Sequence, residues 1–222
     1  MRLSHLVLCL LLFVSALAVM AAEAPVAPAK PTYEPPTRDE AVAVQKQGRY
    51  LATITMEQNR RIELVLEGSY MPLTVANFIK LTSAKYYDGL AFFRLYKPYF
   101  VQGGDQNGDG TGTPGYTINL EISPFLSHKK GAISLAHAFN KNINTNYPNS
   151  GGSQFFILQK DAVGFDGQYA VFGWVKSGMD VVEKIREKDV MLSVTVAPYF
   201  GDDKCPILAE GTTRDKAPDG KK

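Results

Sequence analysis

Short runs rich in β-branched and aromatic residues recur from Tyr50 to Val196, and they constrain the fold class of this chain. Apolar and polar residues alternate on either side of Gln58-Asn59-Arg60, which predicts a hairpin. Apolar residues follow helical spacing in two stretches, after Pro72 and from Met179 to Glu187. Many short strands with two helices predict a mainly β fold, a closed antiparallel barrel whose ends the helices cap. The predicted strands are Tyr50–Met56, Arg61–Leu66, Phe92–Leu95, Phe100–Gln102, Ala132–Ala136, Gln154–Leu158, Tyr169–Val175 and Leu192–Val196.

The charge balance argues against partners that bind through a strong electric field. The 222 residues include 24 Lys and Arg against 22 Asp and Glu, which gives a formal net charge of +2 with no long run of either sign. Nucleic-acid-binding domains usually carry a basic patch, so we expect neither nucleic acid nor an anionic membrane surface as a partner. With 45% hydrophobic residues the chain can bury a core of its own, and we expect a monomer.

The N-terminus carries the features of a secretory signal. Arg2 begins a short basic start, and an apolar run without charge extends from Leu6 to Met20. Ala16-Leu17-Ala18 or Val19-Met20-Ala21 then offers small residues for cleavage. Because the run is short for a bilayer span, we interpret residues 1–22 as a cleaved signal. We expect export to the periplasm or cell envelope without stable membrane insertion after cleavage, and an uncleaved anchor is the alternative.

Residues 23–48 and 201–222 flank the predicted domain, which we place at residues 49–200. The first segment is rich in Ala and Pro and predicts an extended tether, in which Arg38–Lys46 forms one or two helical turns. The second segment is polar and predicts a frayed tail. Once the signal is removed Cys205 is the single cysteine, so an internal disulfide is excluded.

Several ligand-binding patterns are present only in part. Gly110–Gly115 fits the dinucleotide-binding fingerprint, but a strand follows it, so the helix N-terminus that would bind pyrophosphate is missing. Asp105–Asp109 supplies the first ligand positions of a calcium loop, whereas Tyr116 occupies the position of the bidentate carboxylate. His128 and His137 have no partner at zinc-ligand spacing. We therefore expect no cofactor and no metal, with calcium at the acidic loop as an alternative.

Aromatic and amide residues are dense around one arginine. Arg94, Phe100 and Gln102 follow one another at even spacing. Their side chains share one face of paired strands if the Lys97-Pro98 turn restores the register. An ordinary surface arginine beside core phenylalanines is the alternative, and the pattern alone does not decide between them.

The run around this arginine resembles the cyclophilin signature Phe-His-Arg-x-x-x-x-Phe-x-x-Gln-Gly-Gly-Asp, with Phe93 in place of the histidine. Further blocks agree in order with the same family, from about Tyr50 to about Val196. They are Pro72–Phe78, Gly131–Ala138, Gly152–Ile157 and Phe165–Gly173. The resemblance implies an eight-stranded antiparallel barrel capped by two α-helices, peptidyl-prolyl cis/trans isomerase activity and proline-containing polypeptides as substrates.

The resemblance also implies roles for individual residues. Arg94 is the expected catalytic arginine, with Gln102 and Phe100 in the catalytic group. Aromatic side chains would wall a proline pocket, amides would flank the peptide, and a ridge at residues 136–138 would hold its backbone. The implied substrate-binding residues are Tyr99, Ala136, His137, Ala138, Gln154, Phe156, Phe165 and Tyr169. Gly164 stands at the family's tryptophan position, which bears on cyclosporin binding, and Phe139–Asn149 is longer than the family's loop.

Uncatalysed rotation about an X–Pro bond takes on the order of tens of seconds or longer, so an isomerase can assist folding. We expect this chain to act in that way on exported polypeptides. Two alternatives are a cyclophilin-like chaperone or scaffold with little turnover and a calcium-stabilised envelope domain built on Asp105–Asp109.

Overall fold

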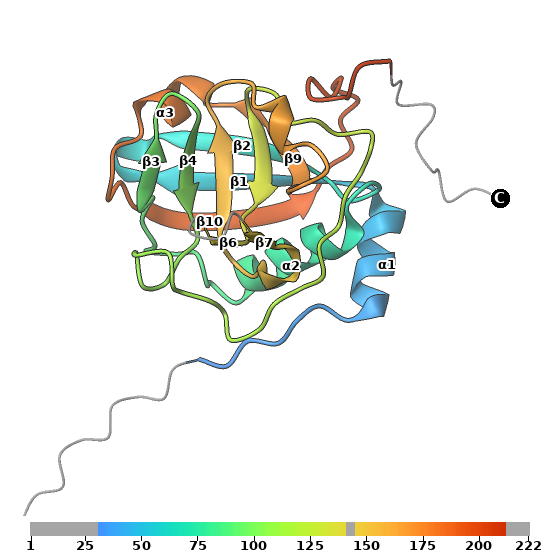
Figure 1. Cartoon of the computed structure of the whole chain (residues 1–222), viewed down its shortest axis with the longest axis horizontal. Helices are drawn as coiled ribbons and strands as arrows, with labels where there is room; N and C mark the ends of the chain where they lie inside the picture. The colour runs from blue at the N-terminus through green and yellow to red at the C-terminus, as the bar shows by residue number, and fades with distance from the viewer. Residues whose placement is uncertain (1–30, 141–144, 212–222) are drawn as a thin grey trace, which may run out of the picture. The chain divides into compact units, whose positions relative to one another are not determined.

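Eight strands form one antiparallel sheet that curls around the core (Figure 1), within a computed structural model that describes residues 31–140 and 145–211. Along the sheet the order is β10-β1-β2-β9-β5-β8-β4-β3. These strands are β1 Arg49–Met56, β2 Arg61–Glu67, β3 Arg94–Tyr96, β4 Phe100–Gly103, β5 Ala132–Leu135, β8 Phe155–Leu158, β9 Ala170–Ser177 and β10 Met191–Pro198. The predicted first hairpin places Ile54 opposite Ile62, and the mainly β antiparallel architecture is confirmed.

Strand pairing does not close the barrel along its whole length. In the described part of the chain, β3 and β10 are the two edges of the sheet and do not pair with each other. The segments that precede them do meet: Phe92 N–H donates to Asp189 O at 2.9 Å, and Met191 N–H donates to Leu90 O at 2.8 Å. The expectation of a closed barrel is therefore corrected to a curled sheet whose two edges meet at one end only, because β3 ends after three residues at Tyr96 whereas β10 continues to Pro198.

Helix α2, Pro72–Ser83, covers one end of the sheet with an apolar face. Val75, Phe78 and Leu81 are buried on that face, and the Phe78 ring stacks on Tyr87 with centroids 4.9 Å apart. The residue at the N-cap makes no side-chain capping bond, and the Glu121 carboxylate accepts from the second and third helical N–H groups at 3.0 and 2.8 Å instead. A loop far along the chain is thus attached to the start of the helix.

The compact unit extends beyond the predicted limits of 49–200 and includes the chain from Thr32 onward. Helix α1, Arg38–Gln47, begins with a capping box between Thr37 and Glu40 and lies alongside α2 (Figure 1), with Val44 buried. Part of the predicted tether therefore belongs to the folded domain. Part of the predicted tail does as well, since Ile207 is fully buried and Ser127 N–H donates to its carbonyl oxygen at 2.9 Å.

The remaining elements lie near the loops. Helix α3, Met179–Lys184, is shorter than predicted and buries Val182. Strands β6, Ala138–Asn140, and β7, Thr145–Tyr147, pair as a hairpin inside the stretch that the sequence marked as long. Neither strand was predicted, because each has only three residues and lacks the alternation on which strand prediction depends.

The predicted signal peptide and the alternative anchor lie outside the described residues. Over the residues that are described, no helix combines the length and apolar character needed to span a bilayer.

Candidate active site

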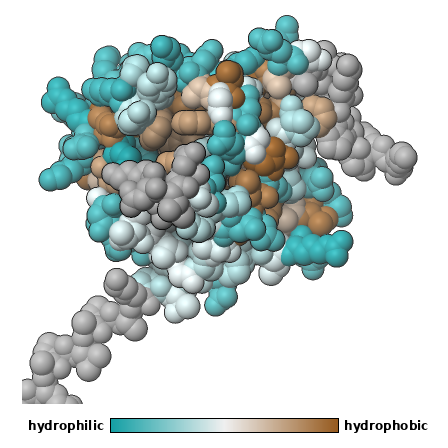
Figure 2. Space-filling view, in the orientation of Figure 1, coloured by the Kyte–Doolittle hydropathy of each residue, from teal (hydrophilic) through white to brown (hydrophobic). Residues whose placement is uncertain are grey.

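A groove of about 590 Å³ lies beside strands β3, β4 and β8. In this region Figure 2 shows hydrophobic side chains gathered at the surface and bordered by hydrophilic ones. The groove lining includes Arg94, Phe100, Gln102, Ala136, His137, Ala138, Gln154, Phe156, Phe165 and Tyr169, which are all of the predicted site residues except Tyr99. Lining residues that were not predicted include Gly110, Thr111, Gly112, Thr113, Thr117, Phe139 and Ser150. Side chains from distant parts of the sequence therefore meet in one groove.

One wall of the groove is a line of hydrogen-bonded polar side chains. Arg94 on β3 pairs directly with Gln102 on β4, so both side chains emerge on the same face. Arg94 Nη1 donates to Gln102 Oε1 at 3.1 Å, and Gln102 Nε2 donates to Gln154 Oε1 at 2.9 Å. Gln154 Nε2 in turn donates to the carbonyl oxygens of Gly110 and Gly112, each at 3.0 Å. These bonds form the polar wall, in which each amide is held at both ends.

The other wall consists of aromatic rings. Phe156 on β8 is central: its ring centroid lies 5.1 Å from Phe100, 6.2 Å from Phe165 and 5.6 Å from Tyr169. The Phe165 and Tyr169 rings lie 5.3 Å apart. Burial raises the pKa of the Tyr169 phenol, so this side chain stays neutral at physiological pH. The aromatic wall, defined by these four rings, gives the groove an apolar side.

A buried histidine that the sequence analysis left without a role lies behind the aromatic wall. The His128 ring centroid is 6.1 Å from Phe156 and 5.8 Å from Phe165. Its Nδ1 lies 2.7 Å from Asp166 Oδ1, and its Nε2 lies 3.1 Å from Ser134 Oγ. This order of groups is that of a hydrolytic triad, but Ser134 and His128 are fully buried, so substrate cannot reach them. The cluster instead supports the rings in front of it.

Burial lowers the pKa of His128 and outweighs the opposite influence of the Asp166 carboxylate. For Asp166, burial alone would raise the pKa, but hydrogen bonds from Ser127 and His128 lower it below its usual value. The short distance between the two side chains is therefore consistent with a neutral imidazole that donates Nδ1–H to an ionised carboxylate. No sequence spacing indicated this pair, because the two residues come from separate loops.

Residues 136–138, the predicted ridge, line the groove and are anchored by their neighbours. Ala136 N–H donates to Gln154 O at 2.9 Å, and Ala138 N–H donates to Ser150 Oγ at 2.8 Å. The His137 ring stacks on Tyr169 with centroids 4.2 Å apart and an interplanar angle of 10°. The ridge is thus joined both to the polar wall and to the aromatic wall.

Two residues highlighted from the sequence do not line the groove. Tyr99, expected beside the proline pocket, stacks instead on Tyr96 at 5.7 Å and is 38% exposed, because the turn between β3 and β4 directs it away. Gly164 lies in a short 3₁₀ turn before Phe165, and a Cβ added there would meet no atom within 4 Å. That position is open to solvent in this protein.

In the acidic loop that was the candidate calcium site, the carboxylates accept hydrogen bonds from backbone N–H groups of the loop itself. Asp105 is 2% exposed and accepts N–H bonds from Asn107 at 2.9 Å, from Asp109 at 3.0 Å and from Gly110. Asp109 accepts from Thr111 N–H at 2.8 Å. Within residues 31–140 and 145–211, no three His, Cys, Asp or Glu side chains are grouped so that they could hold a metal ion. The loop is ordered by its own backbone donors.

A curled antiparallel sheet with an arginine–amide line and an aromatic wall in one groove defines a protein suited to binding a peptide with a small apolar ring. The family model for "Cyclophilin type peptidyl-prolyl cis-trans isomerase/CLD" matches residues 51–199. The chain belongs to this family.

Individual proteins agree with this assignment. Peptidyl-prolyl cis-trans isomerase B of Bacillus subtilis is 41% identical over 143 residues, which cover 64% of this chain and 94% of that protein. A peptidyl-prolyl cis-trans isomerase of Helicobacter pylori is 36% identical over 148 residues, covering 65% of this chain and 85% of that protein. A cyclophilin type isomerase of Cryptosporidium parvum has a similar structure, with a TM-score of 0.59, 25% identity and coverage of 67% of this chain and 98% of that chain. That protein has also been solved in the presence of the dipeptide Ala-Pro, and this second structure gives a TM-score of 0.55 with 25% identity and coverage of 68% and 99%.

Proposed function

We propose that this chain catalyses cis/trans isomerisation of X–Pro bonds in exported polypeptides, and so assists their folding, with Arg94 as the catalytic group. The observation that carries the proposal is the hydrogen-bonded line Arg94–Gln102–Gln154 in the same groove as the aromatic wall. Proline supplies the ring for the pocket, and the adjoining peptide supplies the polar groups for the amides.

The chemistry requires stabilisation of a twisted amide. Resonance opposes rotation with a barrier of about 18–20 kcal/mol. When the bond twists, the proline nitrogen recovers its lone pair and becomes a better hydrogen-bond acceptor. A guanidinium beside that nitrogen then stabilises the twisted form more than the planar one, which is the differential stabilisation that lowers a barrier. Arginine suits this task because its planar guanidinium offers several N–H donors in a fixed arrangement.

The remaining groove residues would hold the substrate during rotation. The aromatic wall holds the proline ring while the preceding carbonyl turns, and Gln102 and Gln154 offer amides to the peptide backbone. Because Gln102 already receives a bond from Arg94, its orientation is set before substrate arrives. Preorganisation of this kind reduces the cost of ordering the site.

Arg94→Ala tests the mechanism in a proline-peptide isomerisation assay. We expect kcat/KM to fall by about 10²–10³, because one electrostatic donor is lost. The thermal transition should hardly move, because Arg94 is exposed. Arg61→Ala is the control, an exposed arginine on β2 outside the groove, and it should leave turnover unchanged.

Wild-type-like turnover in Arg94→Ala would end the proposed mechanism. Binding of proline peptides by the natural protein without turnover would favour the chaperone or scaffold alternative. Lower thermal stability after addition of a chelator would favour the calcium alternative.

The proposal that the substrates are exported polypeptides rests on the signal-like N-terminus. An uncharged apolar run from Leu6 to Met20 is followed by small residues. We expect cleavage between Ala18 and Ala22, so that the mature protein begins in the Ala- and Pro-rich segment. N-terminal sequencing of protein isolated from a native envelope fraction measures this directly. Retention of Met1 or Arg2 in a membrane pellet would instead support an anchor.

A further inference from the structure

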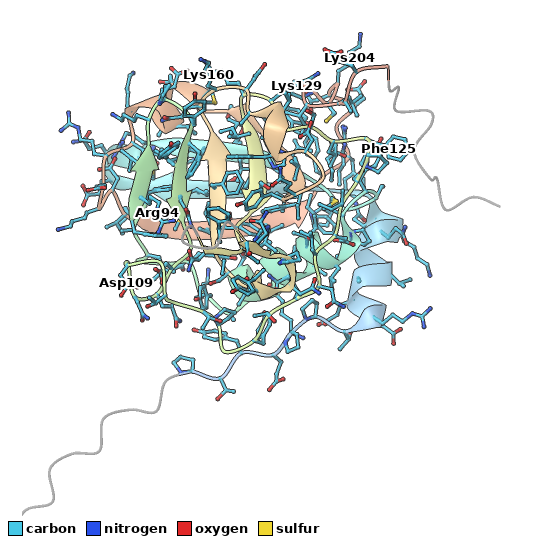
Figure 3. The ribbon with its side chains drawn as sticks, in the orientation of Figure 1. Arg94, Asp109, Phe125, Lys129, Lys160 and Lys204 are labelled. Carbon is cyan, nitrogen blue, oxygen red and sulfur yellow. The ribbon has the colours of Figure 1, made fainter. Side chains whose placement is uncertain are left out.

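Gly110 lies directly against the guanidinium of Arg94. A Cβ placed on this glycine would come within 2.9 Å of Arg94 Nη2, which is closer than real Cβ contacts allow. Figure 3 labels Arg94 and Asp109, the residue before Gly110, in the loop that lies below the arginine in that view. Because Gly110 has no side chain, the Arg94 guanidinium can occupy the space beside it.

The loop that carries Gly110 is fixed from beneath. The buried Asp105 carboxylate accepts N–H bonds from Asn107, Asp109 and Gly110, and such charge-assisted bonds are strong. The Gly110 backbone has φ +95°, a conformation that L side chains rarely adopt. Because the carboxylate holds the N–H of Gly110 itself, this part of the loop cannot move away easily to make room for a side chain.

The same glycine also closes a circuit of contacts. Arg94 donates to Gln102, Gln102 donates to Gln154, and Gln154 donates to the carbonyl oxygen of Gly110. The guanidinium is thus placed by a hydrogen bond on one side and by the backbone of Gly110 on the other. A displacement of Gly110 would affect both ends of the polar wall.

We propose that Gly110 is a positioning residue for Arg94, and that Asp105 serves the same purpose by holding the loop. The proposal rests on the proposed function, since it concerns where the catalytic guanidinium lies. Neither residue needs to contact the reacting bond. Their contribution is to hold the Arg94 guanidinium in the position from which it can donate to the proline nitrogen of the substrate.

Gly110→Ala tests the contact, and Gly108→Ala is its matched control. Gly108 lies in the same loop with φ +71°, but a Cβ there meets no atom within 4 Å. Both variants carry the cost of alanine at positive φ, and only Gly110→Ala presses on Arg94. We expect Gly110→Ala to lower kcat by about 10–100-fold with a smaller change in KM, because a misplaced catalytic group costs up to about that much. Gly108→Ala should stay within about twofold of the natural enzyme.

A double-mutant cycle separates positioning from general damage to the fold. If Gly110 acts through Arg94, Gly110→Ala has no further effect on kcat in the Arg94→Ala background. Equal losses in both backgrounds, or an equal loss from Gly108→Ala, would overturn the proposal while leaving the role of Arg94 intact. Failure of Arg94→Ala alone to lower turnover would instead refute the proposed role of Arg94 as the catalytic group, on which this proposal rests.

Asp105→Asn tests the position of Gly110 without adding an atom to the loop. It replaces the first test if Gly110→Ala does not fold. The amide keeps the size of the carboxylate but loses its charge, which weakens the N–H bonds that hold the loop. We expect a smaller fall in kcat that again disappears in the Arg94→Ala background. A fall that persists in that background contradicts the proposal.

Discussion

The two walls of the groove are built on different physical principles. The polar wall is a series of directional bonds that begins at the exposed Arg94, continues through the buried Gln102 and the half-buried Gln154, and ends at the loop carbonyl of Gly110. The aromatic wall is held by ring contacts around the buried Phe156, with the His128–Asp166 pair behind it. One wall depends on donor–acceptor geometry, and the other depends on packing with the core.

This difference separates the expected effects of substitution. A change at Arg94 in the polar wall alters the chemistry and spares stability, because this exposed side chain contributes little buried area. A change in the aromatic wall alters substrate binding and stability together, because Phe156 is only 4% exposed and belongs to the core. A substitution in the aromatic wall that changes turnover without changing stability would contradict this distinction between the two walls.

Phe156→Leu is the direct test of the aromatic wall. It removes a ring that contacts three other wall residues, so we expect KM for proline peptides to rise about three- to tenfold with little change in kcat. The free energy of unfolding should also fall by about 1–2 kcal/mol, because the smaller side chain fills the space less well. Steady-state kinetics and chemical denaturation measure the two effects separately.

Phe172→Leu provides the matched control for that substitution. Phe172 on β9 is 1% exposed and packs against Phe78 at 5.6 Å, outside the groove lining. It should lose a similar amount of stability without a change in KM. An equal rise in KM in both variants would mean that Phe156 affects binding only through the core, and the distinction between the walls would fail.

Strand geometry predicted part of the groove from the sequence, whereas the place of Gln154 was implied only by the resemblance to the family. Side chains two residues apart on a strand share a face, so Phe100 and Gln102 were expected to project together. The structure adds that Arg94 pairs with Gln102 across the two strands. The antiparallel sheet was predicted for the same reason, since alternation along a strand is a local pattern.

The support behind the aromatic wall could not be predicted in this way. His128 and Asp166 meet although they are 38 positions apart, and no spacing rule joins residues of separate loops. The ends of the domain were missed for a related reason. Val44 and Ile207 lie in short apolar runs, Ala41–Val44 and Cys205–Ala209, with polar residues on either side, and only tertiary contacts show that they are buried. The close approach of Gly110 to Arg94 likewise appears only when both segments are placed in space.

The His128–Asp166 pair behind the aromatic wall predicts that the stability of the folded protein depends on pH. Burial lowers the pKa of His128 below its usual value of 6.5. Just below that pH, His128 therefore binds a proton in the unfolded chain but stays neutral in the folded protein. Stability is therefore fully present above about pH 6.5 and falls as the pH decreases toward the folded pKa. The lowered pKa of Asp166 acts in the same direction at more acidic pH, below its usual value of 3.8.

His128→Asn isolates this contribution, because an amide can still donate to Asp166 but does not titrate. We expect the natural protein to lose stability between about pH 7.5 and about pH 5.5, measured by chemical denaturation, and the variant to lose distinctly less. The starting stability of the variant should be somewhat lower, since the imidazole packs against the rings of the aromatic wall. The matched control is His137→Asn, which removes the partly exposed histidine of the ridge and should keep the natural pH dependence. If His128→Asn retains the full pH dependence while His137→Asn loses it, the acid sensitivity lies in the ridge, and the buried pair is not what sets it.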